Sequence, residues 1–130
     1  MAALSVFIVD DDPGNLNSLQ FLLEAEGYDV HAFLNGIEML ERIHEILPRC
    51  IVIDYKLDHL DGLEIARRVR RQNAAIPIII VTGHPDPDIR RRVERTGLPL
   101  IEKPLSQDSI LSAVAAASHP DNEQDIDRTR

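Results

Sequence analysis

Short apolar runs without a polar residue recur along this chain, and each is followed by a stretch with the spacing of an amphipathic helix. The clearest runs are Val6–Val9, Cys50–Ile53 and Ile78–Val81. A strand that is apolar on both faces has to be covered on both faces, which occurs almost only in parallel sheets flanked by helices. The alternation therefore predicts β-α units, because parallel neighbours need a crossover connection.

Two further predicted strands have the character of sheet edges. Residues 28–33 alternate apolar and polar side chains, and residues 98–101 include Pro99, which cannot donate a hydrogen bond to a neighbouring strand. With the three apolar runs in the centre, we expect an α/β fold with a doubly wound, five-stranded parallel sheet in the order 2-1-3-4-5 and helices on both faces. Residues 3–117 form this domain, and the polar residues 118–130 form a flexible tail.

Apolar spacing also predicts the helices between these strands. The second helix has apolar residues at positions 37, 40, 43 and 47, and we expect it to end before Pro48. The fourth helix is short of apolar positions, with Ile89 and Val93 as its main anchors. It is therefore predicted to bury little surface.

Composition narrows the class of protein. The 130 residues suffice for one ordinary domain, and a content of 44% apolar and 28% charged residues argues against wholesale disorder. No apolar run approaches the roughly 18 residues that span a bilayer, and no secretory signal is visible, so we expect a cytoplasmic protein without membrane contact. The formal charge of −8 argues against direct nucleic-acid binding, and Cys50, the single cysteine, is predicted to be a buried hydrophobe.

Polar side chains gather where the predicted strands end. Asp10 and Asp11 follow the first strand, Asp54 the third, Thr82 the fourth and Lys103 the fifth. Carboxyl ends of parallel strands share one edge of the sheet, and ligands bind where the strand order reverses. Three carboxylates there repel one another, and an oxygen-only cluster open to solvent suits Mg²⁺ better than Zn²⁺. The Lys103 ammonium and the Thr82 hydroxyl supply a cation and a hydrogen-bond donor, which are the groups that bind a phosphoryl group.

In this order and spacing the motifs resemble the receiver domain of two-component response regulators. The matching segments are Val9–Asp12, Ile53–Asp54 with Asp61–Gly62 seven and eight residues further on, Val81–Gly83 and Glu102–Pro104. The resemblance covers about residues 3–117 and implies the flavodoxin-like order 2-1-3-4-5. It implies a phosphorelay signalling domain, not an enzyme, that takes a phosphoryl group from a histidine of a sensor kinase or a phosphotransfer protein.

The resemblance also implies a role for each residue at this edge. Asp54 is similar to the phosphoacceptor, Asp11 to the direct Mg²⁺ ligand and Asp10 to the acid that acts largely through water. The backbone carbonyl of Lys56 matches a further Mg²⁺ ligand, two residues past the acceptor. In the same family, the residues that match Thr82 and Lys103 bind the phosphoryl oxygens.

Some positions depart from the family pattern. Asp58 stands where the family usually has proline. A further acid near the site would bias metal affinity, but we expect its side chain to point at solvent. Leu100 replaces an aromatic residue that normally changes position with the threonine, so we expect output without an aromatic switch. The stretch from Thr82 to Lys103 is about one residue shorter than usual. The conformational change in this chain therefore need not follow the common path.

Arginines gather on the predicted third and fourth helices, which hold eight of the fourteen basic residues. Two interpretations of these arginines are open. They keep exposed helical faces soluble, or they form a docking surface for an acidic partner or a second copy of the domain. A last helix is predicted after Ser106, with Ile110, Leu111 and Val114 facing inward. We expect output, including formation of a homodimer, through the surface of the fourth helix, the strand at residues 98–101 and this last helix. The arginines are Arg67, Arg68, Arg70, Arg71, Arg90, Arg91, Arg92 and Arg95.

Two other functions use similar features. Phosphatases of the aspartyl-phosphate type carry an Asp-x-Asp motif with a threonine two residues after its second aspartate. In this chain the residue two positions after Asp12 is Gly14. Such enzymes also need a substrate-cap domain, for which 130 residues leave no room. A pseudo-receiver that acts only as a binding module is the other alternative, and the complete acceptor set argues against it.

Overall fold

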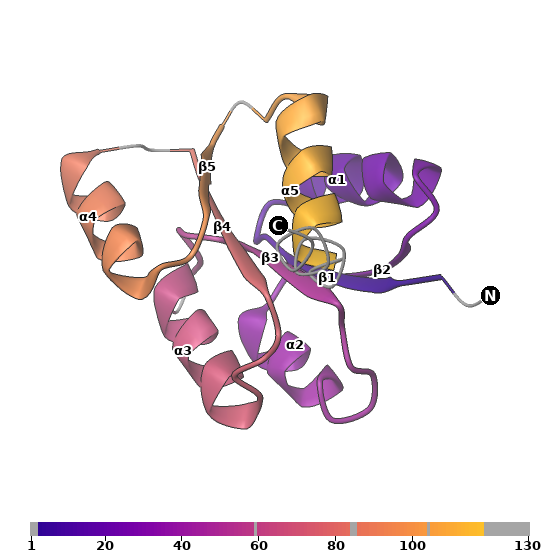
Figure 1. Cartoon of the computed structure of the whole chain (residues 1–130), viewed down its shortest axis with the longest axis horizontal. Coiled ribbons are helices and arrows are strands. Elements are labelled where there is room, and N and C mark those ends of the chain that lie inside the picture. The colour runs from indigo at the N-terminus through magenta and orange to yellow at the C-terminus, as the bar shows by residue number, and fades with distance from the viewer. Residues whose placement is uncertain (1–2, 59, 84–85, 104, 119–130) are drawn as a thin grey trace, which may run out of the picture.

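A single parallel sheet of five strands organises the protein (Figure 1). The structure is a computed structural model, and it describes residues 3–58, 60–83, 86–103 and 105–118. Strand order is β2-β1-β3-β4-β5, as the sequence predicted. The elements in chain order are β1 (Ser5–Val9), α1 (Pro13–Ala25), β2 (Asp29–Phe33), α2 (Gly36–Arg42), β3 (Cys50–Asp54), α3 (Gly62–Gln72), β4 (Ile78–Thr82), α4 (Pro87–Thr96), β5 (Leu100–Glu102) and α5 (Gln107–Ser118).

Burial divides the strands into centre and edges. Every residue of β3 and β4 is buried, whereas β2 mixes buried and exposed positions and β5 has no buried residue. Pro99, just before β5, contributes its carbonyl, which accepts a hydrogen bond from the Ile80 amide at 2.9 Å. At the edge of the sheet no further strand needs a hydrogen bond from the backbone nitrogen of residue 99, so a proline is tolerated at this position.

Two separate apolar clusters cover the two faces of the sheet. Phe7 and Val9 of β1 pack with α2, α3 and α4, whereas Val6 and Ile8 pack with α1 and α5. Figure 1 shows these two groups of helices on opposite sides of the strands. Cys50 is buried in the second cluster, as predicted, and burial raises the pKa of its thiol to about 12.

Helix α2 is shorter than its apolar spacing predicted. It ends at Arg42, and the Glu45 amide donates to the Arg42 carbonyl three residues back, so the chain tightens before residue 47. The Leu47 side chain is 62% exposed, although Ile43 stays buried. The reason is tertiary: the chain must turn so that the Arg49 amide reaches the Ser5 carbonyl, at 2.8 Å, and enters β3.

The C-terminal helix extends slightly into the predicted tail. Ser118 is the last residue of α5 and is buried. Residues 119–130, the remainder of that predicted tail, lie outside the described residues. Among the helices that the structure describes, none is long and apolar enough to cross a membrane.

Helix α4 should be the first helix to open. Val93 is its single buried residue, with Ile89 partly buried, whereas five residues of α3 are buried. Less apolar burial means less free energy to open the helix locally. Native-state hydrogen exchange followed by mass spectrometry should therefore show faster exchange in residues 87–96 than in residues 62–72. Slower exchange in α4 than in α3 would contradict this.

Candidate functional site

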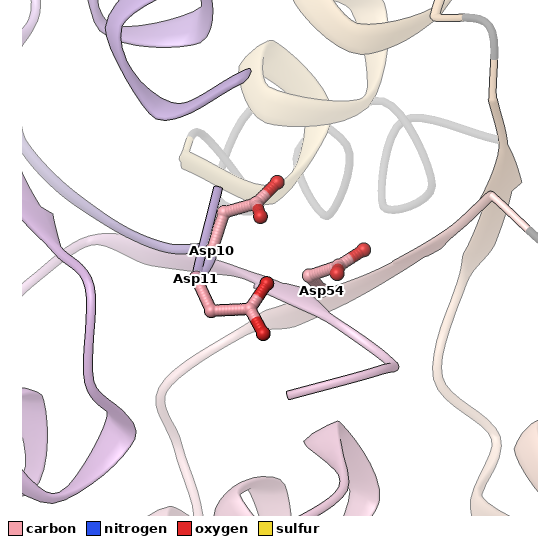
Figure 2. A group of neighbouring side chains, drawn as sticks. All are labelled: Asp10, Asp11 and Asp54. Carbon is pink, nitrogen blue, oxygen red and sulfur yellow. The ribbon is translucent and has the colours of Figure 1, made fainter. Parts of the chain in front are cut away.

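Three carboxylates meet at the carboxyl edge of the sheet, where β1 and β3 lie side by side. Asp10 and Asp11 follow β1 directly, and Asp54 is the last residue of β3. One carboxylate oxygen from each residue lies within 4.8 Å of the other two, and Figure 2 shows the side chains grouped in this way. Asp10 and Asp54 are buried, and Asp11 is half-buried.

A single ammonium group faces two of these acids. The Lys103 Nζ lies 3.2 Å from the Asp10 Oδ2 and 3.3 Å from the Asp54 Oδ1. The Lys103 amide donates to the Thr82 carbonyl at 2.8 Å, which fixes the chain just past β5 against the end of β4. Thr82 is itself buried and ends β4, one residue past Val81, which pairs with Asp54. The structure thus brings Asp10, Asp11, Asp54 and Lys103 together, with Thr82 on the adjoining strand.

Burial and like charge shift the titration of the acids. Burial raises the pKa of Asp54 to about 6, and the Asp10 carboxylate adds to this increase while Lys103 opposes it. Partial burial also raises the pKa of Asp11, with a contribution from the carboxyl of Asp58. Burial alone would lower the pKa of Lys103, but Asp54 and Asp10 outweigh it and raise that pKa. The site therefore concentrates more negative charge than its one lysine offsets.

The donor set fits a hard divalent cation. Carboxylate oxygens that converge at a partly solvated edge are the ligands preferred by Mg²⁺, while Zn²⁺ favours nitrogen and sulfur. Cys50 is buried in the cluster under α1 and α5 and offers no thiolate to this edge. Lys56, two residues after Asp54, has an exposed side chain, and the role of its carbonyl stays a prediction.

Asp58 has an exposed side chain, as the sequence predicted. Its carboxyl also contributes to the raised pKa of Asp11, after the larger effect of burial. A fourth acid therefore adjoins the cluster, and its effect on metal affinity stays a prediction.

The N-terminus of α3 packs directly on the backbone of the third strand. The Gly62 amide donates to the Tyr55 carbonyl at 2.7 Å, and Asp61 caps the helix by accepting from the Glu64 amide at 2.9 Å. A Cβ on residue 62 would lie 2.5 Å from the Asp54 carbonyl oxygen and 3.0 Å from the Tyr55 Cα. Glycine is required here because any side chain would push the helix away from Asp54.

Comparison with known proteins places these features in one family. The model of the response regulator receiver domain matches residues 6–115. The transcriptional regulatory protein FixJ of Bradyrhizobium diazoefficiens is 30% identical over 113 residues, which are 86% of this chain and 55% of that protein. Nodulation protein W of the same organism is 35% identical over 120 residues, or 92% of this chain and 53% of that protein. The chain spans about half the length of these curated relatives.

Solved structures agree on the fold. The crystal structure of a CheY-like receiver domain protein from Methanospirillum hungatei JF-1 superposes with a TM-score of 0.86. It covers 95% of this chain and 99% of its own, at 24% sequence identity. At this identity the similarity shows a shared fold and says nothing about function.

Replacing Gly62 should damage both stability and the site. We expect Gly62→Ala to lower the free energy of unfolding by about 1–3 kcal/mol, because the new Cβ meets backbone atoms that have no room to move. Gly14→Ala is the matched control: its Cβ would lie 3.4 Å from the Asp12 Oδ1, an ordinary contact in the first turn of α1. Urea denaturation measures both variants. Equal stability of Gly62→Ala and the unmodified chain would refute the close approach.

Proposed function

The chain belongs to the response regulator receiver domain family, and from this premise we propose that Asp54 accepts a phosphoryl group from a phosphorylated histidine. The donor is a sensor histidine kinase or a phosphotransfer protein of a two-component system. The observation that supports this most strongly is the meeting of Asp54 with Asp10, Asp11 and Lys103 at one edge of the sheet. A nucleophile, two further acids and a fixed cation are the groups that phosphoryl transfer to a carboxylate requires.

The transfer is a displacement at phosphorus. A carboxylate oxygen of Asp54 forms the new phosphorus–oxygen bond while the phosphorus–nitrogen bond of the donor breaks, and the leaving imidazole keeps the electron pair and takes up a proton. Because the pKa of Asp54 is about 6, its carboxyl is mainly ionised at neutral pH and available as the nucleophile. The Lys103 ammonium, which contacts the Asp54 carboxylate before transfer, then binds one phosphoryl oxygen. The Thr82 hydroxyl donates a hydrogen bond to a second phosphoryl oxygen.

We assign the metal site to Asp10, Asp11, Asp54 and the carbonyl of Lys56. A bound Mg²⁺ would supply positive charge to the oxygens of the transferring group. Asp11 is the acid with the most accessible charge, because Asp10 is already bound to Lys103 and its Oδ1 accepts from the Asp12 amide at 2.9 Å. The chain assists its own phosphorylation and dephosphorylation and has no separate substrate, so we do not class it as an enzyme.

The alternatives have less support. The Gly14 amide donates to the Asp12 side chain at 2.9 Å as part of the α1 cap, and glycine has no hydroxyl to act as the threonine of an aspartyl-phosphate phosphatase. A pseudo-receiver that only binds partners would not need the pairing of Lys103 with Asp54. Phosphorylation of Asp54 by acetyl phosphate distinguishes a true receiver from both alternatives.

Output is proposed to leave through the exposed surface of α4, β5 and α5. All four arginines of α4 are exposed, and an acidic partner or a second copy of the chain would take the place of Glu102 and Asp88, which pair with three of them here. The proposal places the protein in the cytoplasm, without direct nucleic-acid binding by this domain and without membrane contact. Sedimentation equilibrium before and after phosphorylation measures self-association, and an unchanged mass would remove the homodimer from the proposal.

Asp54 should be the sole acceptor. With Mg²⁺ and acetyl phosphate, the mass spectrum of the intact chain should show one added phosphoryl group, and Asp54→Asn should abolish it because the amide is not a nucleophile. Asp58→Asn removes a neighbouring carboxyl and should still be labelled. Equal labelling of Asp54→Asn and the unmodified chain would overturn the assignment.

The two acids after β1 should differ in their effect on the metal. We expect Asp11→Asn to weaken Mg²⁺ binding by at least about tenfold, and Asp10→Asn to weaken it less, because Lys103 already offsets the Asp10 charge. Isothermal titration with MgCl₂ measures both. Asp12→Asn is the control, since asparagine caps a helix as well as aspartate does. Equal losses at positions 10 and 11 would contradict this order.

A further inference from the structure

Arginine side chains make the polar attachments of α4 to its neighbours. The Arg70 Nη1 of α3 donates to the Thr96 carbonyl at 3.2 Å. From α4 itself, the Arg90 Nε donates to the Glu102 Oε2 at 2.7 Å. With so little of α4 buried, these contacts matter more for its position than they would in a well-buried helix.

A third attachment reaches the residue next to the phosphoacceptor. The Arg92 Nη1 donates to the Tyr55 hydroxyl at 3.4 Å, and Tyr55 directly follows Asp54. Glu102, the partner of Arg90, directly precedes Lys103. Two arginines of one helix thus contact the chain neighbours of the two charged residues that face each other in the site.

The Tyr55 side chain is well suited to carry a displacement. It is buried in the cluster under α2, α3 and α4. Its amide donates to the Val81 carbonyl at 2.7 Å, and its carbonyl accepts from the Gly62 amide at 2.7 Å. Because both backbone groups are held, a shift at Asp54 moves the tyrosine ring and its hydroxyl together.

The other attachments are less able to report on Asp54. Arg90 and Glu102 are both substantially exposed, and an exposed ion pair of this kind is screened by water and salt. Leu100 of β5, which stands at the position of the family's aromatic residue, has no polar atom to offer α4. Arg92 is as exposed as Arg90, but its partner is a hydroxyl on a buried ring whose residue directly follows Asp54.

We propose that Tyr55 and Arg92 form the link through which the occupancy of Asp54 sets the position of α4. This link rests on the proposed function, because it needs a phosphoryl group on Asp54 to act. Tyr55 and Arg92 are positioning residues: neither has to touch the phosphoryl group.

The test uses beryllofluoride with Mg²⁺ as the probe and Tyr55 as its own reporter. The chain has two tyrosines and no tryptophan, so a Tyr28→Phe background leaves Tyr55 as the sole emitter. Adding the probe should change the Tyr55 emission, and Arg92→Gln should reduce that change to less than about one third. Arg91→Gln removes the same charge from the same helix. Both Arg91 and Arg92 pair with Asp88 of α4, at 2.9 and 3.5 Å, but the contact with Tyr55 is made by Arg92. Arg91→Gln should behave as the parent, and Arg92→Lys should restore part of the response.

Hydrogen exchange provides a second readout that does not depend on fluorescence. Removing one hydrogen bond should speed exchange in residues 87–96 by about two- to tenfold in Tyr55→Phe and in Arg92→Gln, and the double variant should show no further increase. In each of these variants the probe should no longer change exchange in α4. Exchange in residues 62–72 should stay constant.

Two failures are distinguishable. If fluorine NMR shows that beryllofluoride does not bind the unmodified chain, the proposed function fails, and the link fails with it. If the probe binds, but Arg92→Gln and Arg91→Gln give the same Tyr55 response, the proposed function stands and the link is overturned.

Discussion

Like charge confined to one edge of the sheet is the constraint on which the rest of the site depends. Asp54 is held against Asp10 and Asp11 by two neighbouring buried strands, and burial, together with the charge of Asp10, raises its pKa to about 6. Lys103 offsets part of this increase by contacting two of the acids at once. The remaining excess of negative charge is what makes the site receptive to a cation.

The backbone around Asp54 is held as firmly as its side chain. Tyr55 is fixed on one side by Val81 of β4 and on the other by Gly62 at the start of α3. The glycine matters for its lack of a side chain, since it lets the first turn of α3 lie against the carbonyl of the acceptor. Because Tyr55 is held on both sides, it moves together with Asp54 and not separately from it.

Much of this could be predicted from the sequence, because the informative features are local. Continuous apolar runs marked the central strands, Pro99 marked an edge, and the site residues stood where strands end, so topology alone brought Asp10, Asp11 and Asp54 together. The misses are tertiary. The early end of α2 depends on where β3 must begin, and the contact of Tyr55 with Arg92 joins residues with no periodic relation.

The sheet also separates the apolar interior into two compartments. Adjacent residues of a central strand belong to different ones: Ile80 packs toward α2, α3 and α4, whereas Ile79 packs toward α1 and α5. A volume lost on one side cannot be refilled by a larger side chain on the other, because the backbone of the strands lies between them. The two halves of the core are therefore free to drift in sequence independently, each compensating only for its own substitutions.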